Sequence, residues 1–246
     1  MKSYNVAISI PNEGVTRPES YDNHLVVSFH LGRLEEQWRR ENREIQYKFH
    51  WFTAGRLLTP MAREKLVKEA LKAGMDYIIM YDDDMILPID MFEKLLEDVE
   101  KNPEIDVLAP LAFMRNPPHF AVMYTATEGY DNVRHQEYFK NDFVKNYPRN
   151  KLVECDAVGF GAVLINLRIL KDMDEPYFFS TTGTGEDIWF CFKAKKQGGR
   201  VFMDTRIKLG HLANPVIVDE EYVDKWNKKE KVKFEDKPHK YLSKTR

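Results

Sequence analysis

The chain has 246 residues, a formal net charge of -2, 43% hydrophobic residues and 31% charged residues. This length can bury a complete core, and the balanced charge argues against a protein that binds nucleic acid over its whole surface. Both cysteines, Cys155 and Cys191, lie among apolar residues, so we expect buried thiols, as suits the cytoplasm. We expect no signal peptide and no membrane span, because the N-terminal apolar run is short and no stretch reaches ~20 apolar residues.

The first half of the chain alternates between two kinds of hydrophobic pattern. Short apolar or aromatic runs predict strands at residues 6–10, 47–52, 77–81 and 105–109. Apolar residues with helical spacing predict helices at residues 22–45, 59–74 and 90–102. This alternation is typical of an α/β fold with a mostly parallel central sheet and helices on both faces.

The helix starts carry their own signals. Thr59 and Pro60 suit the cap and first position of the second helix, and Asp90 with Glu93 resembles a capping box for the third. Arg63 lies in the first turn of its helix, where a cation opposes the macrodipole. An anionic ligand would explain Arg63, although a plain surface arginine is the commoner case.

Three consecutive acids, Asp82, Asp83 and Asp84, follow the apolar run at residues 77–81. They are therefore expected at the carboxyl end of a buried strand, which is where open α/β sheets bind their ligands. Adjacent carboxylates repel one another, and a hard divalent cation would relieve that repulsion through oxygen ligands. On these residues alone, a solvated acidic turn is as good an interpretation as a metal site.

The second half of the chain is less regular. Residues 115–151 combine prolines with many aromatics and predict an irregular or antiparallel region, which would be a sugar-binding platform or a small satellite core. Residues 157–165 predict a strand in which Gly159 and Gly161 allow the close approach of a backbone or a ligand. Glu186 and Asp187 begin a predicted helix, where acids are ordinarily caps. Two short strands, residues 200–204 and 207–209, then lead to His211.

Four segments, in order, carry a family resemblance. They read YDDDM at residues 81–85, CDAVGFG at 155–161, GEDIWFC at 185–191 and GH at 210–211. Together they resemble nucleotide-sugar glycosyltransferases of the GT-A fold, most closely the large inverting family with its compact bacterial and viral members. The resemblance covers about Val6 to His211 and implies a GT-A-like (Rossmann-like) sheet with a small antiparallel or irregular acceptor-side region.

The resemblance implies a metal site. Asp84 would bind Mn²⁺ or Mg²⁺ directly, and Asp82 would contact the nucleotide ribose or the waters of the metal. The triplet leaves the division of roles open, so Asp83 is also a candidate for donor binding. His211 matches the histidine that completes the metal site in many members of the family.

The resemblance also implies a donor site for a UDP- or GDP-sugar. Arg63 matches a donor-binding arginine, and Pro11 with Asn12 lies where the first loop meets the nucleotide base. The acid that the family places after its second strand has no obvious counterpart at residues 51–56. The acceptor would be a hydroxyl of a glycan, a lipid-linked molecule or a protein.

The chemistry of such a transfer assigns roles to two further acids. A divalent cation neutralises the charge that develops on the leaving diphosphate, and a carboxylate must take the proton of the incoming hydroxyl. Asp187 matches the general base of the family, with Glu186 as the neighbour that holds the acceptor or orients the loop. Inversion is the preferred outcome; retention stays open, as do a nucleotidyltransferase and a non-catalytic, cation-dependent carbohydrate-binding module.

The C-terminal part of the chain lies outside the resemblance. We expect a catalytic domain at residues 1–214 and a charged extension at residues 215–246. From Lys225 to Arg246 there are nine Lys or Arg residues and three acids. A solvated extension is the ordinary interpretation, and peripheral contact with an anionic membrane is the alternative hypothesis. No nucleic-acid partner is expected.

Overall fold

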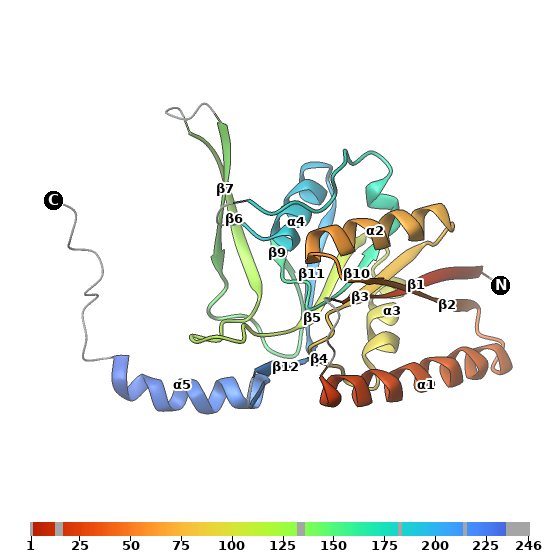
Figure 1. Cartoon of the computed structure of the whole chain (residues 1–246), viewed down its shortest axis with the longest axis horizontal. Coiled ribbons are helices and arrows are strands. Elements are labelled where there is room, and N and C mark those ends of the chain that lie inside the picture. The colour runs from red at the N-terminus through yellow and green to blue at the C-terminus, as the bar shows by residue number, and fades with distance from the viewer. Residues whose placement is uncertain (1, 13–16, 132–135, 182–183, 214–215, 235–246) are drawn as a thin grey trace.

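The computed structural model describes residues 2–12, 17–131, 136–181, 184–213 and 216–234 (Figure 1). A seven-stranded sheet forms its centre, in the order β2-β1-β3-β10-β5-β11-β8. The strands of this sheet are β1 (Lys2–Asn12), β2 (Ile45–Gly55), β3 (Tyr77–Tyr81), β5 (Ile105–Leu111), β8 (Leu152–Cys155), β10 (Ala162–Asn166) and β11 (Arg200–Lys208).

The sheet is mostly parallel, as the alternation of predicted strands and helices indicated. β1 pairs in parallel with β2 and β3, and β5 pairs in parallel with β11. β10 runs antiparallel between β3 and β5, and β8 runs antiparallel to β11 at the edge. The carboxyl ends of β1, β3 and β5 therefore meet at one side of the sheet, where ligands of open α/β folds bind.

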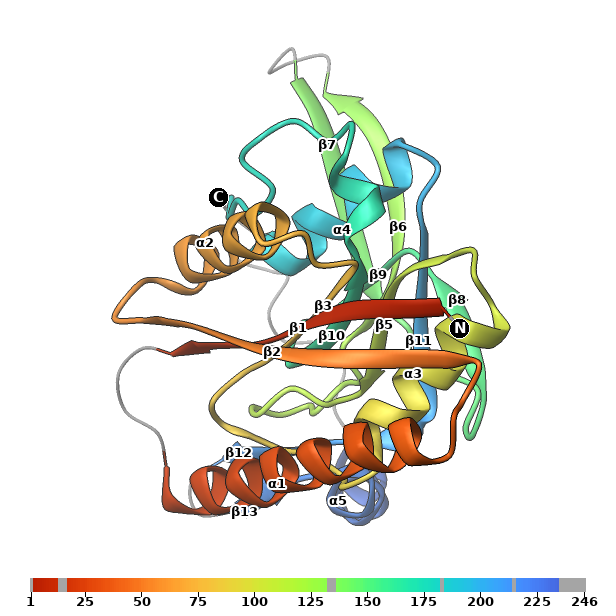
Figure 2. The ribbon, with the colours of Figure 1, turned by 90° about the vertical axis from the view of Figure 1, so that its right-hand side faces the viewer.

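Helices cover both faces of the sheet, as predicted. On one face lie α1 (Pro18–Arg40) and α3 (Met91–Lys101), and on the other lie α2 (Thr59–Lys72) and α4 (Glu186–Lys196) (Figure 2). The side chains of β3 alternate accordingly: Ile78 and Met80 pack with α2 and α4, whereas Ile79 packs with α1 and α3. A strand buried on both faces reads as a continuous apolar run, which is the pattern of residues 77–81.

Two small antiparallel sheets complete the fold. In the first, β12 (Gly210–Ala213) lies between β4 (Met85–Ile86) and β13 (Val216–Val218). In the second, the long hairpin of β6 (Met123–Asp131) and β7 (Gln136–Phe143) pairs with β9 (Ala157–Val158). The antiparallel region predicted within residues 115–151 is thus confirmed as this hairpin. A 3₁₀ turn (Leu167–Leu170) and α5 (Glu220–Phe234) are the remaining elements.

Several predicted boundaries were wrong. The first helix ends at Arg40, because Asn42 adopts a positive φ of 50° and β2 begins at Ile45. The cap of α2 is Leu58, so Thr59 already lies inside the helix. The strands predicted at residues 200–204 and 207–209 form the single strand β11.

The predicted capping box at α3 does not form either. Asp90 occupies the cap position, but its side chain makes no capping hydrogen bond. The Glu93 carboxylate, which would complete the box, is instead bonded to His30 of α1. A contact between distant helices has therefore replaced a local one.

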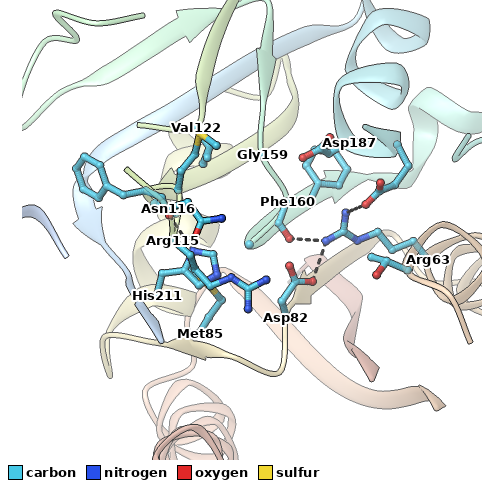
Figure 3. A pocket seen from close by; sticks show the side chains of 16 residues that line it. Arg63, Asp82, Met85, Arg115, Asn116, Val122, Gly159, Phe160, Asp187 and His211 are labelled. Atoms are coloured by element: carbon cyan, nitrogen blue, oxygen red, sulfur yellow. Dashed lines mark hydrogen bonds and ion pairs between the residues drawn. The ribbon is translucent and has the colours of Figure 1, made fainter. Parts of the chain in front are cut away.

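Gly159 and Gly161 lie where side chains approach the backbone closely. A Cβ on Gly159 would lie 2.7 Å from Cβ of Val122, and one on Gly161 would lie 3.1 Å from Cε of Met85. Figure 3 shows Gly159, Val122 and Met85 around the same pocket. The backbone also approaches both glycines, since the Gly159 N–H donates to the Val122 carbonyl at 2.7 Å and the Gly161 carbonyl accepts from the Asp82 N–H at 2.9 Å. The close approach of a backbone predicted from these glycines is therefore confirmed.

The chain beyond residue 215 packs against the rest of the molecule where it is described. β13 pairs with β12, and the rings of Tyr222 and Trp226 each lie 5.3 Å from the His119 ring. Val223 is buried. Among the described residues, no helix has the length and apolar content needed to cross a membrane.

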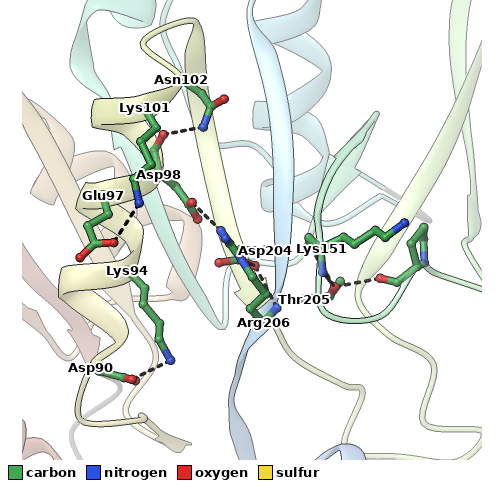
Figure 4. A network of polar contacts seen from close by, with 11 residues as sticks. Asp90, Lys94, Glu97, Asp98, Lys101, Asn102, Lys151, Asp204, Thr205 and Arg206 are labelled. Atoms are coloured by element: carbon green, nitrogen blue, oxygen red, sulfur yellow. Dashed lines mark hydrogen bonds and ion pairs between the residues drawn. The ribbon is translucent and has the colours of Figure 1, made fainter.

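A buried pair of carboxyl groups joins α3 to β11 (Figure 4). Asp98 and Asp204 are 4% and 0% exposed, and Arg206 donates to Oδ1 of both. Burial, together with the charge of Asp204, raises the pKa of Asp98 to about 6 against the opposite effect of Arg206. Asp98 therefore binds a proton at a higher pH than it would in an unfolded chain.

Asp204→Asn should stabilise the protein above pH about 6. The folded-state pKa of Asp98 is raised, so its contribution to stability is present at acid pH and is lost as pH rises through about 6. The amide keeps Oδ1 as the acceptor for Arg206 and offers Asp98 an N–H in place of a second carboxylate oxygen. Urea unfolding should show a gain of roughly 1 to 3 kcal/mol near neutral pH and almost none at pH ~4.

Asp90→Asn is the matched control, because Asp90 precedes the same helix but its side chain is half exposed and paired with Lys94. It should change the unfolding free energy little at either pH. If the Asp204→Asn protein lost stability toward neutral pH as steeply as the wild type, Asp204 would not be a cause of the raised pKa of Asp98.

Candidate active site

The candidate site is a cavity of about 390 Å³ at the carboxyl ends of β3 and β5 (Figure 3). Five of the residues singled out in the sequence line it: Arg63, Asp82, Glu186, Asp187 and His211. They come from α2, the end of β3, the start of α4 and β12. Segments far apart in the chain thus bring their ionisable side chains to one place.

Arg63 joins three of these segments. Its Nη1 donates to Glu186 at 2.6 Å, and its Nη2 donates to Asp82 at 2.8 Å and to the Phe160 carbonyl at 2.9 Å. The side chain is only 3% exposed. Burial acts against the charge, but Asp82 and the two acids of α4 outweigh it and raise the pKa of Arg63. The anions that Arg63 meets in the structure are therefore acids of the chain itself.

Asp187 lies at the first turn of α4 with its carboxylate toward the cavity. Its Oδ1 accepts a hydrogen bond from the Ile188 N–H at 2.8 Å. A Cβ on Gly185 would lie 2.6 Å from that same oxygen, so glycine leaves room for the carboxylate. Burial and the adjacent charge of Glu186 raise the pKa of Asp187, while Arg63 acts in the opposite direction. This carboxyl can therefore accept a proton more readily than an ordinary aspartate.

Glu186 is held in place from two sides. One carboxylate oxygen accepts from Arg63, and the other accepts from the Ser180 hydroxyl at 3.2 Å. Its interactions fix the loop that precedes α4. The side chain is therefore suited to orienting the start of this helix.

Asp84 and His211 meet on the other side of the cavity. The backbone carbonyl of Asp84 accepts from the Leu212 N–H at 3.0 Å, and β12 thereby brings His211 next to the acid. Nε2 of His211 lies 3.4 Å from Oδ2 of Asp84, which also accepts from Arg115 at 2.9 Å. Burial alone would raise the pKa of Asp84, but His211 and Arg115 outweigh it and lower that pKa.

A second cavity of about 390 Å³ adjoins the first and shares Thr59, Asp82 and Arg115 with it. The rest of its lining is Pro11, Arg17, Asp83 and Asp84. Pro11 lies near the end of β1, and Asn12 is the last residue of that strand; the Asn12 side chain is outside the described part. The candidates for donor and metal binding thus lie mainly around the second cavity.

The side chains around Asp84 supply part of the ligand set that a divalent cation needs. Nδ1 of His211 lies 2.8 Å from the Phe113 carbonyl, which can only accept, so Nδ1 carries the proton and Nε2 is directed at Asp84. Histidine ligands of metals commonly have such a second partner. Asp82 is bonded to Arg63, and among the described residues no three His, Cys, Asp or Glu side chains form a metal-binding group. One carboxylate and one imidazole suit a cation whose other ligands are phosphates and waters.

Sequence reasoning missed the two cations of the second cavity. Arg115 pairs with Asp84, and Arg17 donates to the Leu212 carbonyl at 3.3 Å. Arg115 lies four residues beyond β5, and Arg17 directly precedes α1. Their positions after strand ends could have indicated them, because loops at that edge of the sheet form the binding crevice.

Comparisons with known proteins support the fold. No protein-family model and no curated protein matches the chain. Among solved structures, A197 from STIV has a TM-score of 0.56 and 17% identity, over 90% of this chain and 92% of that one. GalNAc-T7 with UDP, GalNAc and Mn²⁺ has a TM-score of 0.50 and 14% identity, over 85% of this chain but only 44% of that one. Both matches support the GT-A-like α/β fold predicted from the sequence.

Arg63→Met should unfold far more easily than the wild type. The change leaves Asp82 and Glu186 without their buried counter-charge, and loss of one partner of a buried pair costs about 3 to 5 kcal/mol. Arg115→Met is the matched control, since Arg115 is 49% exposed and its loss should cost less than about 1 kcal/mol. Denaturant unfolding of both variants would test this, and equal small losses would contradict a structural role for Arg63.

Proposed function

We propose that the protein is a metal-dependent glycosyltransferase that moves a sugar from a nucleotide-diphosphate sugar to a hydroxyl acceptor with inversion. One observation carries the proposal: His211 and Arg115 both contact Asp84 where two adjoining cavities meet, and Asp187 lines the first of these cavities together with His211 and Arg115. The group around Asp84 suits a diphosphate and its cation, and Asp187 suits a base. The GalNAc-T7 structure, which contains UDP and Mn²⁺, supports this assignment by analogy.

The second cavity is assigned to the nucleotide. Pro11 and Asn12 are assigned to the base, and Asp83 to donor binding. Arg17 and Arg115 supply two guanidinium groups, which pair well with phosphate oxygens. UDP- and GDP-sugars both suit such a site.

Asp84 and His211 would hold Mn²⁺ or Mg²⁺. When bound, such a cation neutralises the charge on the leaving diphosphate. Arg115 is already paired with Asp84 in the protein, and it is available to turn toward a phosphate as Asp84 binds a cation. Arg63 has no such freedom, so we assign it to holding Asp82 and Glu186 in position.

Asp187 is assigned as the general base. A carboxyl with a raised pKa is a better proton acceptor near neutral pH than an ordinary aspartate, which is what abstraction from an acceptor hydroxyl requires. The cavity beside it also has an apolar wall of Phe160, Met85 and Val122, which helps to exclude water. Glu186, fixed by Arg63 and Ser180, orients the base. The acceptor is a glycan, lipid-linked or protein hydroxyl.

The donor site predicts metal-dependent nucleotide binding. Thermal unfolding with UDP, GDP, CMP and dTDP, each with and without Mn²⁺, should show stabilisation by one nucleotide that requires the metal. At ~100 times Kd the expected gain is about 2.7 kcal/mol. Asp84→Ala should lose the gain, because it removes the carboxylate assigned to the cation.

Asp90→Ala is the control, because Asp90 is a half-exposed acid outside both cavities. It should bind like the wild type. Absence of a shift with every nucleotide would count against the transferase and in favour of a carbohydrate-binding module, and release of a nucleoside diphosphate from a sugar donor would exclude such a module.

Asp187→Asn should abolish turnover while leaving the metal-dependent nucleotide shift intact. General-base catalysis contributes about 10² to 10⁴ in rate. Because the folded-state pKa of Asp187 is raised, ionisation costs stability as pH rises through it, so the amide should also raise the thermal midpoint near neutral pH. Wild-type turnover should increase with pH through the same ionisation. Full activity in the amide variant would remove Asp187 from the mechanism.

A further inference from the structure

The outer face of α1 presents a stripe of apolar side chains to solvent, which the exposed Asp22 interrupts near its start. Tyr21, Leu25, Val26 and Phe29 are 58%, 44%, 59% and 70% exposed. Their spacing places them on one side of the helix. The opposite side, which includes Val27 and Leu31, is buried against the sheet. The helix is therefore apolar on both sides, and its outer stripe marks an interaction surface.

A basic helix lies along the same edge of the molecule. In Figure 1 α1 and α5 both lie along the lower side of the protein with β12 between them, and Figure 2 shows both helices at the same lower edge. Arg17 joins the start of α1 to β12 through the Leu212 carbonyl, and β12 pairs with β13, which leads into α5. The stripe and α5 therefore belong to one connected surface.

The outward side of α5 is rich in lysine. Tyr222 and Trp226 face His119 of the protein body, while Lys225, Lys228 and Lys229 are exposed. The sequence continues in the same manner, with nine Lys or Arg and three acids from residue 225 to the last residue. On α1, Arg33 is exposed one turn beyond Phe29. Glu19 and Asp22 are exposed at the start of α1, and Lys225 pairs with Glu221. The positive charge of this surface therefore comes from Arg33, from Lys228 and Lys229, and from the basic sequence that follows them.

We propose that this surface, formed by the outer stripe of α1 and the lysines of α5, docks the protein onto an anionic membrane. The apolar side chains would enter the boundary between head groups and acyl chains, as in interfacial amphipathic helices. The lysines would lie at the level of the acidic head groups, where each basic residue near the surface adds to the attraction.

Charge distinguishes a membrane from a second copy of the chain. A symmetric dimer through the stripe brings like-charged basic segments toward each other, whereas an acidic lipid surface attracts all of them at once. Arg17, one residue before α1, lines the second cavity, so docking places that cavity close to the lipid. The inference holds whatever reaction the protein catalyses.

Co-sedimentation of the full chain with vesicles tests the surface directly. The wild type should bind vesicles of phosphatidylcholine with phosphatidylserine more tightly than vesicles of phosphatidylcholine alone, and high salt should weaken the difference. Leu25→Gln with Phe29→Gln should reduce binding at least about tenfold, because both side chains lose their apolar contact with lipid. Lys228→Gln with Lys229→Gln should weaken binding to the anionic vesicles only.

Leu58→Gln with Met61→Gln is the matched control, since these residues are 71% and 57% exposed but lie at the cap and in the first turn of α2, on the opposite face of the sheet. It should bind vesicles like the wild type. Thermal unfolding and light scattering of each variant accompany the assay. The proposal is overturned if the wild type binds no vesicles, if the stripe variant binds equally well, or if the stripe instead holds a dimer that the variant dissociates.

Discussion

The buried guanidinium of Arg63 is the interaction on which the candidate site depends. A charge this deeply buried is tolerated only with partners, and Arg63 obtains them from the end of β3, from the loop before β10 and from the start of α4. Three loops at the carboxyl edge of the sheet are thus tied to the first turn of α2. The cavity keeps its shape because those loops share one cation.

Two of the three neighbouring acids, Asp82 and Asp84, have different partners, one of which is Arg63. Asp82 turns toward Arg63, while Asp84 turns toward His211 and Arg115. Neighbouring carboxylates repel each other, and each of these two is compensated by a different cation. Asp82 therefore belongs to the wall between the cavities, and Asp84 is the acid that would exchange its arginine for a metal in the proposed mechanism. Arg115 can leave Asp84 more easily than Arg63 can leave Asp82, because Arg115 is half exposed.

The parts of the structure that follow from local pattern could be predicted. The apolar run at residues 77–81, the helix from Thr59 and the acids at a strand end depend on periodicity and on turn residues close by. The antiparallel placement of β10, the pairing of Glu93 with His30 and the bonds of Arg63 to Glu186 and Phe160 depend on residues 60 or more positions away in sequence. Such long-range contacts cannot be read from a sequence. The sequence therefore assigns Arg63 to a ligand, whereas the structure pairs it with acids of its own chain. Arg17 and Arg115 were missed for the same reason.

The surroundings of Asp187 bear on whether it is a helix cap or a base. An acid at a helix N-terminus gains from the helix dipole while it stays ionised, and exposure to water favours that state. Asp187 instead faces a cavity walled by Phe160 and stands next to Glu186, and both burial and the neighbouring charge raise its pKa. If Asp187 only capped the helix, an exposed carboxylate or an amide would stabilise it better, because neither carries a buried charge. Placing an acid where ionisation is costly makes a poor cap and a good proton acceptor, and perturbed acids of this kind gather at functional sites.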